Sequence, residues 1–136
     1  MLNAAAADGW VRAMGVKFVR ATADEVIAEW TVGHEHRQAY GIVHGGVHCG
    51  VIETVASVGA ALVAMPRGQR VVGLENNTSF IKAAREGTLR ATGKPITRGR
   101  RTQVWEVRVD DEKGQLLATG RVRLICLDAD APLAGA

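Results

Sequence analysis

Glu53 is the residue best placed to do chemistry, because it is the only Asp, Glu, Lys or Arg between Gly45 and Pro66. This apolar stretch predicts a long helix with a core-facing stripe. The stripe contains Val47, Val51, Val55, Val58 and Leu62. The opposite side, around Glu53, carries the small residues Gly46, Cys49, Gly50, Ala56, Ser57 and Ala60. A glutamate on such a face meets a packed partner or a pocket, where it can act as a base or a nucleophile. The alternative is a solvated surface glutamate, but no charged neighbour lies near it at helical spacing.

The residues ahead of this helix suit a reaction that develops negative charge. The segment Gly41–Gly46 reads GIVHGG and places Gly45 and Gly46 in the first helical turn. The first backbone N–H groups of a helix have no intrahelical partner and lie at the positive end of its dipole. They can hold an anionic ligand or a developing oxyanion, and glycine leaves the approach open.

Four histidines near the helix start invite a metal-site interpretation: His34, His36, His44 and His48. A zinc site also needs convergent ligands and supporting outer groups, so we predict no metal. His48 falls between the two helical faces and is expected to be structural. Its neighbour Cys49 points about 100° away around the helix, so the two are not a nucleophile–base pair.

The composition indicates a globular protein. The chain has 136 residues, of which 47% are hydrophobic, and this favours a single domain over 1–136. Two distant cysteines, Cys49 and Cys126, do not indicate a disulfide framework. The N-terminus lacks signal-peptide features, and the most apolar run, Val55–Met65, is too short to cross a membrane. We therefore expect a cytoplasmic protein with no membrane partner.

The net charge is +3, and the excess of basic residues lies in the stretch from Lys82 to Arg108. Nucleic acid is not the expected partner, because no aromatic residue lies among Arg98, Arg100 and Arg101 to stack on bases. The alternatives for this stretch are a phosphate-bearing small molecule and a solvated strand face.

Alternation along the rest of the chain predicts an α+β fold, in which an antiparallel sheet of about six strands wraps around the long helix. A short helix is expected over Asn3–Met14, and residues 129–136 are expected to form a loose tail. The predicted strands cover Val16–Ala21, Glu25–Val32, Arg70–Ile81, Gly87–Thr97, Thr102–Asp110 and Leu116–Leu127. The polar run Asn76–Ser79 interrupts the first long strand, so we expect it to line an interface or a ligand site.

The sequence from about Val16 to Leu127 resembles the hotdog-fold acyl-CoA thioesterases. The resemblance rests on Gln38, then Gly41–Gly46, then Glu53 and Ser57. Four further segments look like the aromatic acyl-CoA thioesterases, namely VVGLE at 71–75, AREG at 84–87, QVW at 103–105 and DEKG at 111–114. Members of that branch act on 1,4-dihydroxy-2-naphthoyl-CoA in menaquinone synthesis, or clear mischarged carriers in siderophore synthesis.

The resemblance implies hydrolysis of an aromatic or medium-chain acyl-CoA, with no metal and no cofactor apart from the coenzyme A of the substrate. Glu53 would attack the thioester carbonyl or activate a water, while the N–H of Gly45 would hold the oxyanion. Gln38 would donate a second hydrogen bond or orient the leaving thiolate. His44 would fix the loop and assist near the thioester, and Ser57 would hold the hydrolytic water.

The remaining implied contacts lie around the acyl and coenzyme A groups. Phe80 stands where the menaquinone relatives have a polar histidine, which favours a more apolar acyl group. Arginine forks match phosphate, so several arginines are candidates for the coenzyme A phosphates. The predicted substrate-binding residues are Gly46, Asn77, Ser79, Phe80, Arg85, Arg98, Arg100 and Arg101.

Two other functions remain open from the sequence. A hotdog hydratase or dehydratase would pair an aspartate with a histidine, in a motif that this chain lacks. A non-catalytic acyl-CoA sensor would normally carry a DNA-binding segment, for which no residues are spare.

The small-residue face also predicts self-association. In one sheet wrapped around one helix, no other segment of the chain is expected to cover the face around Gly46 and Gly50. We therefore expect a two-fold dimer with active sites shared between chains. By resemblance, such dimers would pair again into tetramers.

Overall fold

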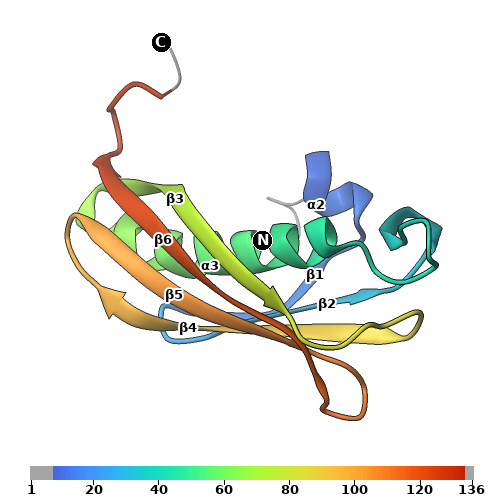
Figure 1. Ribbon diagram of the computed structural model, residues 1–136. Coiled ribbons are helices and arrows are strands. Elements are labelled where there is room, and N and C mark those ends of the chain that lie inside the picture. Colours follow the sequence, from blue (N-terminus) through green and yellow to red (C-terminus); the bar gives the residue numbers. More distant parts are fainter. Residues whose placement is uncertain (1–7, 134–136) are drawn as a thin grey trace.

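One long helix packs against a six-stranded antiparallel sheet in this computed structural model, which describes residues 8–133 (Figure 1). The helices are α2 (Gly9–Ala13) and α3 (Gly45–Ala64), with 3-10 turns η1 (His34–His36) and η2 (Met65–Arg67). The strands are β1 (Lys17–Ala21), β2 (Val26–Thr31), β3 (Gln69–Phe80), β4 (Thr88–Arg98), β5 (Thr102–Asp110) and β6 (Leu116–Asp128). Their order in the sheet is β1-β2-β4-β5-β6-β3, and every neighbouring pair is antiparallel. The predicted fold is confirmed.

The predicted strand boundaries lie within one residue of the observed ones. Of the predicted N-terminal helix, the structure shows Gly9–Ala13, and residues 1–7 lie outside the described part of the chain. The predicted tail begins with an anchored segment, because the N–H of Ala129 donates to the carbonyl of Gly68 at 3.0 Å. Residues 134–136 lie outside the described chain.

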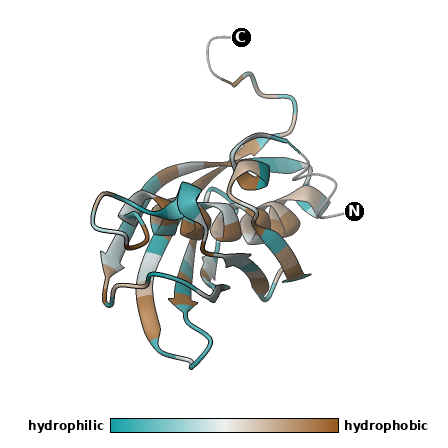
Figure 2. Ribbon diagram, turned by 90° about the vertical axis from the view of Figure 1, so that its right-hand side faces the viewer, coloured by the Kyte–Doolittle hydropathy of each residue, from teal (hydrophilic) through white to brown (hydrophobic). Residues whose placement is uncertain are grey.

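Helix α3 is the core of the fold. By length and composition the stretch Gly45–Arg67 could cross a membrane, but the sheet wraps around it and ten α3 residues are buried, as a core helix requires. Figure 2 shows the hydrophobic residues of α3 and of the strands around it. The helix ends at Ala64, since Pro66 lies in η2 and Gly68 then turns the chain with a φ of 69°.

The prediction for the two faces of α3 was partly wrong. Ala56 and Ala60 are fully buried against the sheet, whereas Val58 and Leu62 are only half-buried. The reason is Trp105 of β5, whose ring would lie 2.5 Å from a Cβ at Gly59. The large ring of Trp105 fills the space between sheet and helix here. The buried face of the helix therefore carries small residues at this point, where larger side chains were expected.

The expectation that no segment of the same chain covers the small-residue face was also wrong. Helix α2 lies beside α3, and a Cβ added at Gly50 would lie 2.4 Å from the ring of Trp10. Trp10 therefore covers Gly50 and itself remains 42% exposed. The part of this face that carries Glu53 meets β3 instead, as described below.

Candidate active site

Glu53 is half-buried at the middle of α3, where it faces β3. Its Oε1 accepts a hydrogen bond from Asn76 Nδ2 at 3.2 Å, and Ser57 Oγ donates to its Oε2 at 3.5 Å. Gly73 provides the space, because a Cβ there would lie 2.3 Å from Oε2. Among the described residues no cation pairs with this carboxylate. The donors that hold it, Asn76 and Ser57, are both neutral.

The first turn of α3 presents a backbone donor. His44 is the N-cap, and its Nδ1 accepts the N–H of Gly46 at 2.7 Å. The N–H of His44 is in turn bonded to the carbonyl of His36 at 2.8 Å, which fixes the loop. No acceptor within residues 8–133 takes the N–H of Gly45. This free donor at the positive end of a long helix suits an oxyanion.

A pocket of about 310 Å³ opens beside this helix start. Its lining comes from the loop before α3, from α3 itself and from the end of β3: Gln38, Ile42, Val43, Gly45, His48, Phe80, Ile81, Lys82 and Ala83. The ring of Phe80 lies against Gly45, where a Cβ would come within 2.7 Å of it. The side chain of Gln38 turns back and accepts the N–H of Tyr40. The pocket is mainly apolar, and Gly45, whose N–H has no acceptor among the described residues, is part of its lining.

His48 is buried in the core beside the pocket. Its side chain is 4% exposed, and its Nδ1 has no hydrogen-bond partner in the described structure. Its ring lies 6.2 Å from that of Trp30 and 6.3 Å from that of Phe80. Burial among these rings lowers the pKa of His48 to about 4, so it is neutral at pH 7.

We expect this buried histidine to make the protein acid-sensitive. The unfolded chain takes up a proton near pH 6.5, whereas folded His48 does so only near pH 4. Stability is therefore fully present above pH 6.5 and declines as the pH falls toward 4, by at most about 1.4 kcal/mol per pH unit. Urea unfolding of wild type and His48→Leu between pH 7 and 4 measures this. The wild type should lose more stability than the variant, and parallel curves would contradict the assignment.

His36, by contrast, is a structural histidine. Its Nδ1 accepts the N–H of Gly33 at 2.9 Å, and its Nε2 lies 2.7 Å from the carbonyl of Met14. It therefore ties the loop before α3 to the N-terminal segment. Within the described ranges, no group of three His, Cys, Asp or Glu residues is placed to hold a metal ion.

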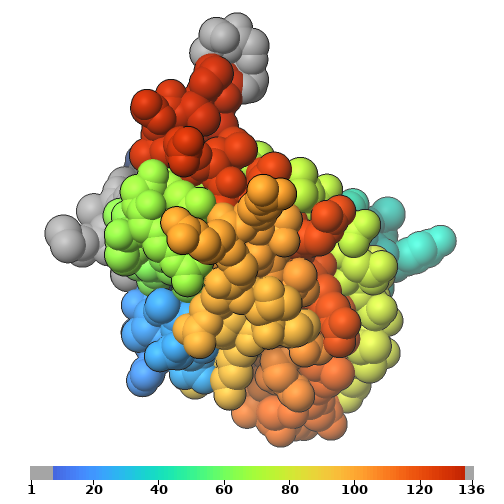
Figure 3. Space-filling view, turned by 90° about the vertical axis from the view of Figure 1, so that its left-hand side faces the viewer, coloured from blue at the N-terminus to red at the C-terminus, as the bar shows by residue number. Residues whose placement is uncertain are grey.

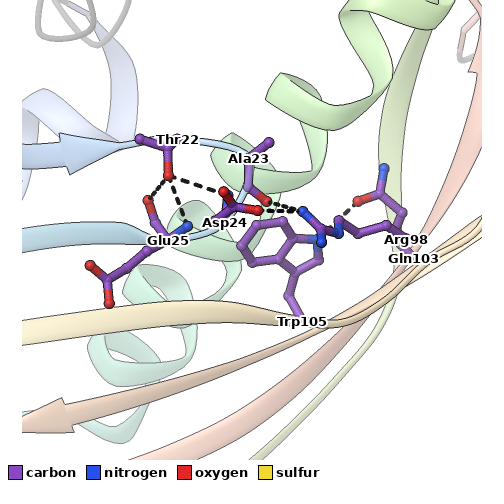
Figure 4. A network of polar contacts seen from close by, with 7 residues as sticks. All are labelled: Thr22, Ala23, Asp24, Glu25, Arg98, Gln103 and Trp105. Atoms are coloured by element: carbon purple, nitrogen blue, oxygen red, sulfur yellow. Dashed lines mark hydrogen bonds and ion pairs between the residues drawn. The ribbon is translucent and has the colours of Figure 1, made fainter.

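The predicted arginines lie in two separate places. Arg85 donates to the carbonyl of Tyr40 at 3.1 Å, near the pocket. Arg98 lies at the opposite end of α3 and pairs with Asp24 at 2.6 Å (Figure 4). Exposed Arg100 and Arg101 follow it in the β4–β5 loop. Figure 3 shows this end of the molecule, where the loop and the C-terminal segment come together. Within one chain, Arg98, Arg100 and Arg101 therefore lie away from the pocket, and Arg85 alone of the four lies near it.

The polar run Asn76–Ser79 of β3 divides between the two sides of the strand, and the predicted binding residues Asn77 and Ser79 are not the ones that contact α3. Asn76 contacts α3, so Asn77 and Ser79 face the other side of the strand by alternation. Thr78 lies on the helix side and donates to Asn76 Oδ1 at 2.6 Å. The strand register shifts between Gly73 and Glu75, and such a bulge reverses the alternation that sequence counting assumes. Asn76 is recognised as a site residue only from the structure, through its hydrogen bond to Glu53.

Within one chain, the predicted catalytic residues form two groups. Gln38 and Gly45 line the pocket and His44 caps the helix next to Gly45, whereas Glu53 and Ser57 lie further along α3 beside β3. Glu53 lies eight positions after Gly45 in the helix, which is about 12 Å along the axis. A thioester carbon cannot touch both within a single chain.

Comparison with known proteins supports one family. The thioesterase superfamily matches residues 40–118. The 1,4-dihydroxy-2-naphthoyl-CoA hydrolase of Escherichia coli is 35% identical over 121 residues, covering 89% of this chain and 88% of that protein. A proofreading thioesterase of Klebsiella pneumoniae is 34% identical over 121 residues, covering 89% and 88%. The crystal structure of a thioesterase from Haemophilus influenzae has a TM-score of 0.91 at 28% identity, covering 98% of this chain and 92% of that one. This chain therefore belongs to the thioesterase superfamily and has its hotdog fold.

Proposed function

We propose that this protein is an acyl-CoA thioesterase that hydrolyses an aromatic or medium-chain acyl-CoA to the free acid and coenzyme A. The observation that carries the proposal is Glu53, the only Asp, Glu, Lys or Arg of α3, which is half-buried and pairs with no cation in the described part of the chain. A thioester is an activated carbonyl, so one carboxylate and an oxyanion donor suffice for its hydrolysis.

The reaction follows from the roles of these groups. Glu53 either attacks the carbonyl carbon, forming an anhydride that water then cleaves, or takes a proton from the attacking water. The carbonyl oxygen gains negative charge, which the N–H of Gly45 stabilises. The C–S bond breaks and coenzyme A leaves as the thiolate, which Gln38 orients. His44 holds the loop that carries Gly45, and Ser57 holds the water beside Glu53.

The separation of Glu53 from Gly45 favours a site built from two chains. Strand β3 lies at the edge of the sheet and pairs only with β6 among the described strands, so its other side is free for a second copy. Large apolar side chains on and beside it are exposed: Val72 by 38%, Leu74 by 48%, Phe80 by 58% and Ile81 by 56%. Exposed apolar residues along a long free edge favour pairing with another β3.

The register of that pairing would complete the site. Gly73 lies beside Glu53, and Phe80 lies beside Gly45. In a two-fold antiparallel pairing centred between Asn76 and Asn77, Gly73 of one chain comes opposite Phe80 of the other. Glu53 of each chain then approaches the pocket and the free N–H of its partner. Asn77, Ser79 and the arginines, with Gly46, stay proposed contacts for the substrate across such an assembly, and further pairing into tetramers stays a proposal.

Mixed dimers test the shared site. Glu53→Ala and Gln38→Ala chains, each inactive alone, are co-expressed with different tags, and the mixed dimer is isolated. One of its two sites carries both lesions and the other carries neither, so about half of the wild-type activity per dimer should return. Homodimers of each variant are the controls. Isolated mixed dimers without activity would mean that each site belongs to one chain.

The pocket indicates the kind of acyl group. With Phe80, Ile42 and Ile81 in its lining, it favours an apolar acyl body over acetyl. Each buried methylene contributes about 0.8 kcal/mol, so benzoyl- or octanoyl-CoA should exceed acetyl-CoA by at least about tenfold in kcat/KM. Release of coenzyme A from a panel of acyl-CoAs, 1,4-dihydroxy-2-naphthoyl-CoA included, measures this preference.

Phe80→His should shift the acyl-group preference toward hydroxylated aromatic groups. A flat profile from acetyl upward would contradict the pocket assignment.

A further inference from the structure

We propose that Asn76 is a positioning residue that holds the carboxylate of Glu53 in its reactive orientation, with Thr78 fixing the amide of Asn76. The inference rests on the proposed function and adds two residues to its machinery. It also assigns different roles to the two oxygens of Glu53.

Asn76 connects β3 to α3 through both hydrogens of its amide. Nδ2 donates to the carbonyl of Cys49 at 3.0 Å and to Oε1 of Glu53 at 3.2 Å. The side chain is half-buried, so these hydrogen bonds are partly shielded from water. A neutral donor at this place orients a carboxylate without cancelling its charge, as a lysine or arginine would.

The orientation of this amide is fixed from both sides. The carbonyl of Cys49 can only accept, so the NH₂ group of Asn76 must face it. On the other side, Thr78 Oγ1 donates to Oδ1 of Asn76 at 2.6 Å. Thr78 has room because Gly120 lies opposite on β6, where a Cβ would come within 2.5 Å of its hydroxyl. A flipped amide would point its oxygen at the carbonyl of Cys49 and at the carboxylate, and both contacts are repulsive.

The two oxygens of Glu53 are therefore unequal. Oε1 is held by Asn76 at 3.2 Å, whereas Oε2 lies over Gly73, and within residues 8–133 its hydrogen bonding is limited to the long contact with Ser57 at 3.5 Å. Oε2 is the oxygen free to attack a thioester or to take a proton from water. Asn76 acts on the reaction through the rotamer of Glu53 and does not itself touch the substrate.

Two variants test the role of Asn76 against a merely structural one. Asn76→Leu removes the hydrogen bond to Glu53, and kcat for benzoyl-CoA should fall about tenfold, because a hydrogen bond to a charged group is lost. KM should change by less than about twofold, since substrate binding is untouched. Thr78→Val leaves the two hydrogen bonds donated by Asn76 Nδ2 in place and removes only the bond from Thr78 that fixes the amide orientation. We therefore expect kcat to fall by about threefold, with an unchanged melting temperature.

A shortened carboxylate supplies the second readout. Glu53→Asp withdraws the carboxylate from Asn76, so adding Asn76→Leu to this variant should lower kcat no further. An unchanged kcat in Asn76→Leu overturns the proposal, and so does the same tenfold loss in the Glu53→Asp background. If Asn76→Leu lowers the melting temperature strongly, Thr78→Val decides alone, and its full activity overturns the role. Wild-type protein that releases no coenzyme A would contradict the proposed function itself.

Discussion

Replacing Glu53 by alanine is expected to lower kcat for acyl-CoA hydrolysis by roughly 10³-fold or more, because the reacting group is lost. Affinity for a non-hydrolysable acyl-CoA analogue should change by less than about threefold, since Glu53 acts on the chemical step and not on binding. Steady-state kinetics and calorimetry measure the two quantities. Helix α3 should remain folded, because alanine is the most favourable helical residue.

Two further replacements make this result specific to the carboxylate. Glu53→Gln keeps the shape and can still accept from Asn76, but it has no charge, so it should lose as much activity as alanine. Glu106→Gln removes an exposed acid from the outer side of β5 and should leave kcat unchanged. If Glu53→Ala keeps even a tenth of wild-type kcat, the assignment of Glu53 is wrong.

Gly73→Ala is expected to lower kcat by up to about 100-fold, because a displacement of the reacting group by about 1 Å can have that effect. The new Cβ would lie 2.3 Å from Glu53 Oε2, and ordinary contact begins at 3.4 Å, so the oxygen must move by about 1 Å. Thiol release from benzoyl-CoA measures the loss.

Stability provides the control for Gly73→Ala. The atom that the new Cβ would meet is Oε2, at the end of the flexible side chain of Glu53. This side chain can move without disturbing the fold, so the melting temperature should hardly change. By comparison, Gly59→Ala would drive a Cβ to 2.5 Å from the fully buried Trp105, and it should lower the melting temperature without acting on Glu53. Full activity in Gly73→Ala would show that the position of Oε2 is not critical.

The fold was predictable because periodicity and chain breaks are local signals. Alternation and turn residues located the six strands, and Pro66 with Gly68 marked the end of the helix. The faces of α3 were less predictable, because the bulk that buries Ala56 and Ala60 comes from Trp105 in a distant strand. No pattern within the helix reveals that partner.

The candidate site was predictable in its residue types and less so in its geometry. The isolated charge of Glu53 and the glycines at the helix start led to the two groups of candidate catalytic residues. Asn76 belongs to the polar run that the sequence marked, but its contact with Glu53 was not predicted, since a bulge between Gly73 and Glu75 changes which side of β3 each residue faces. The aromatic surroundings of His48, which leave its Nδ1 without a partner among the described residues, could not be predicted either, because Trp30 and Phe80 come from two other strands.

Hydrolysis distinguishes an enzyme from an acyl-CoA-binding protein, so the most direct measurement is product formation from benzoyl-CoA. Purified wild-type protein is mixed with an excess of the thioester, and coenzyme A and benzoate are quantified over time. We expect equal amounts of both products, many turnovers per chain, and loss of turnover in Glu53→Ala. Tight binding of benzoyl-CoA by wild-type protein, without release of thiol above the buffer rate, would contradict the thioesterase assignment.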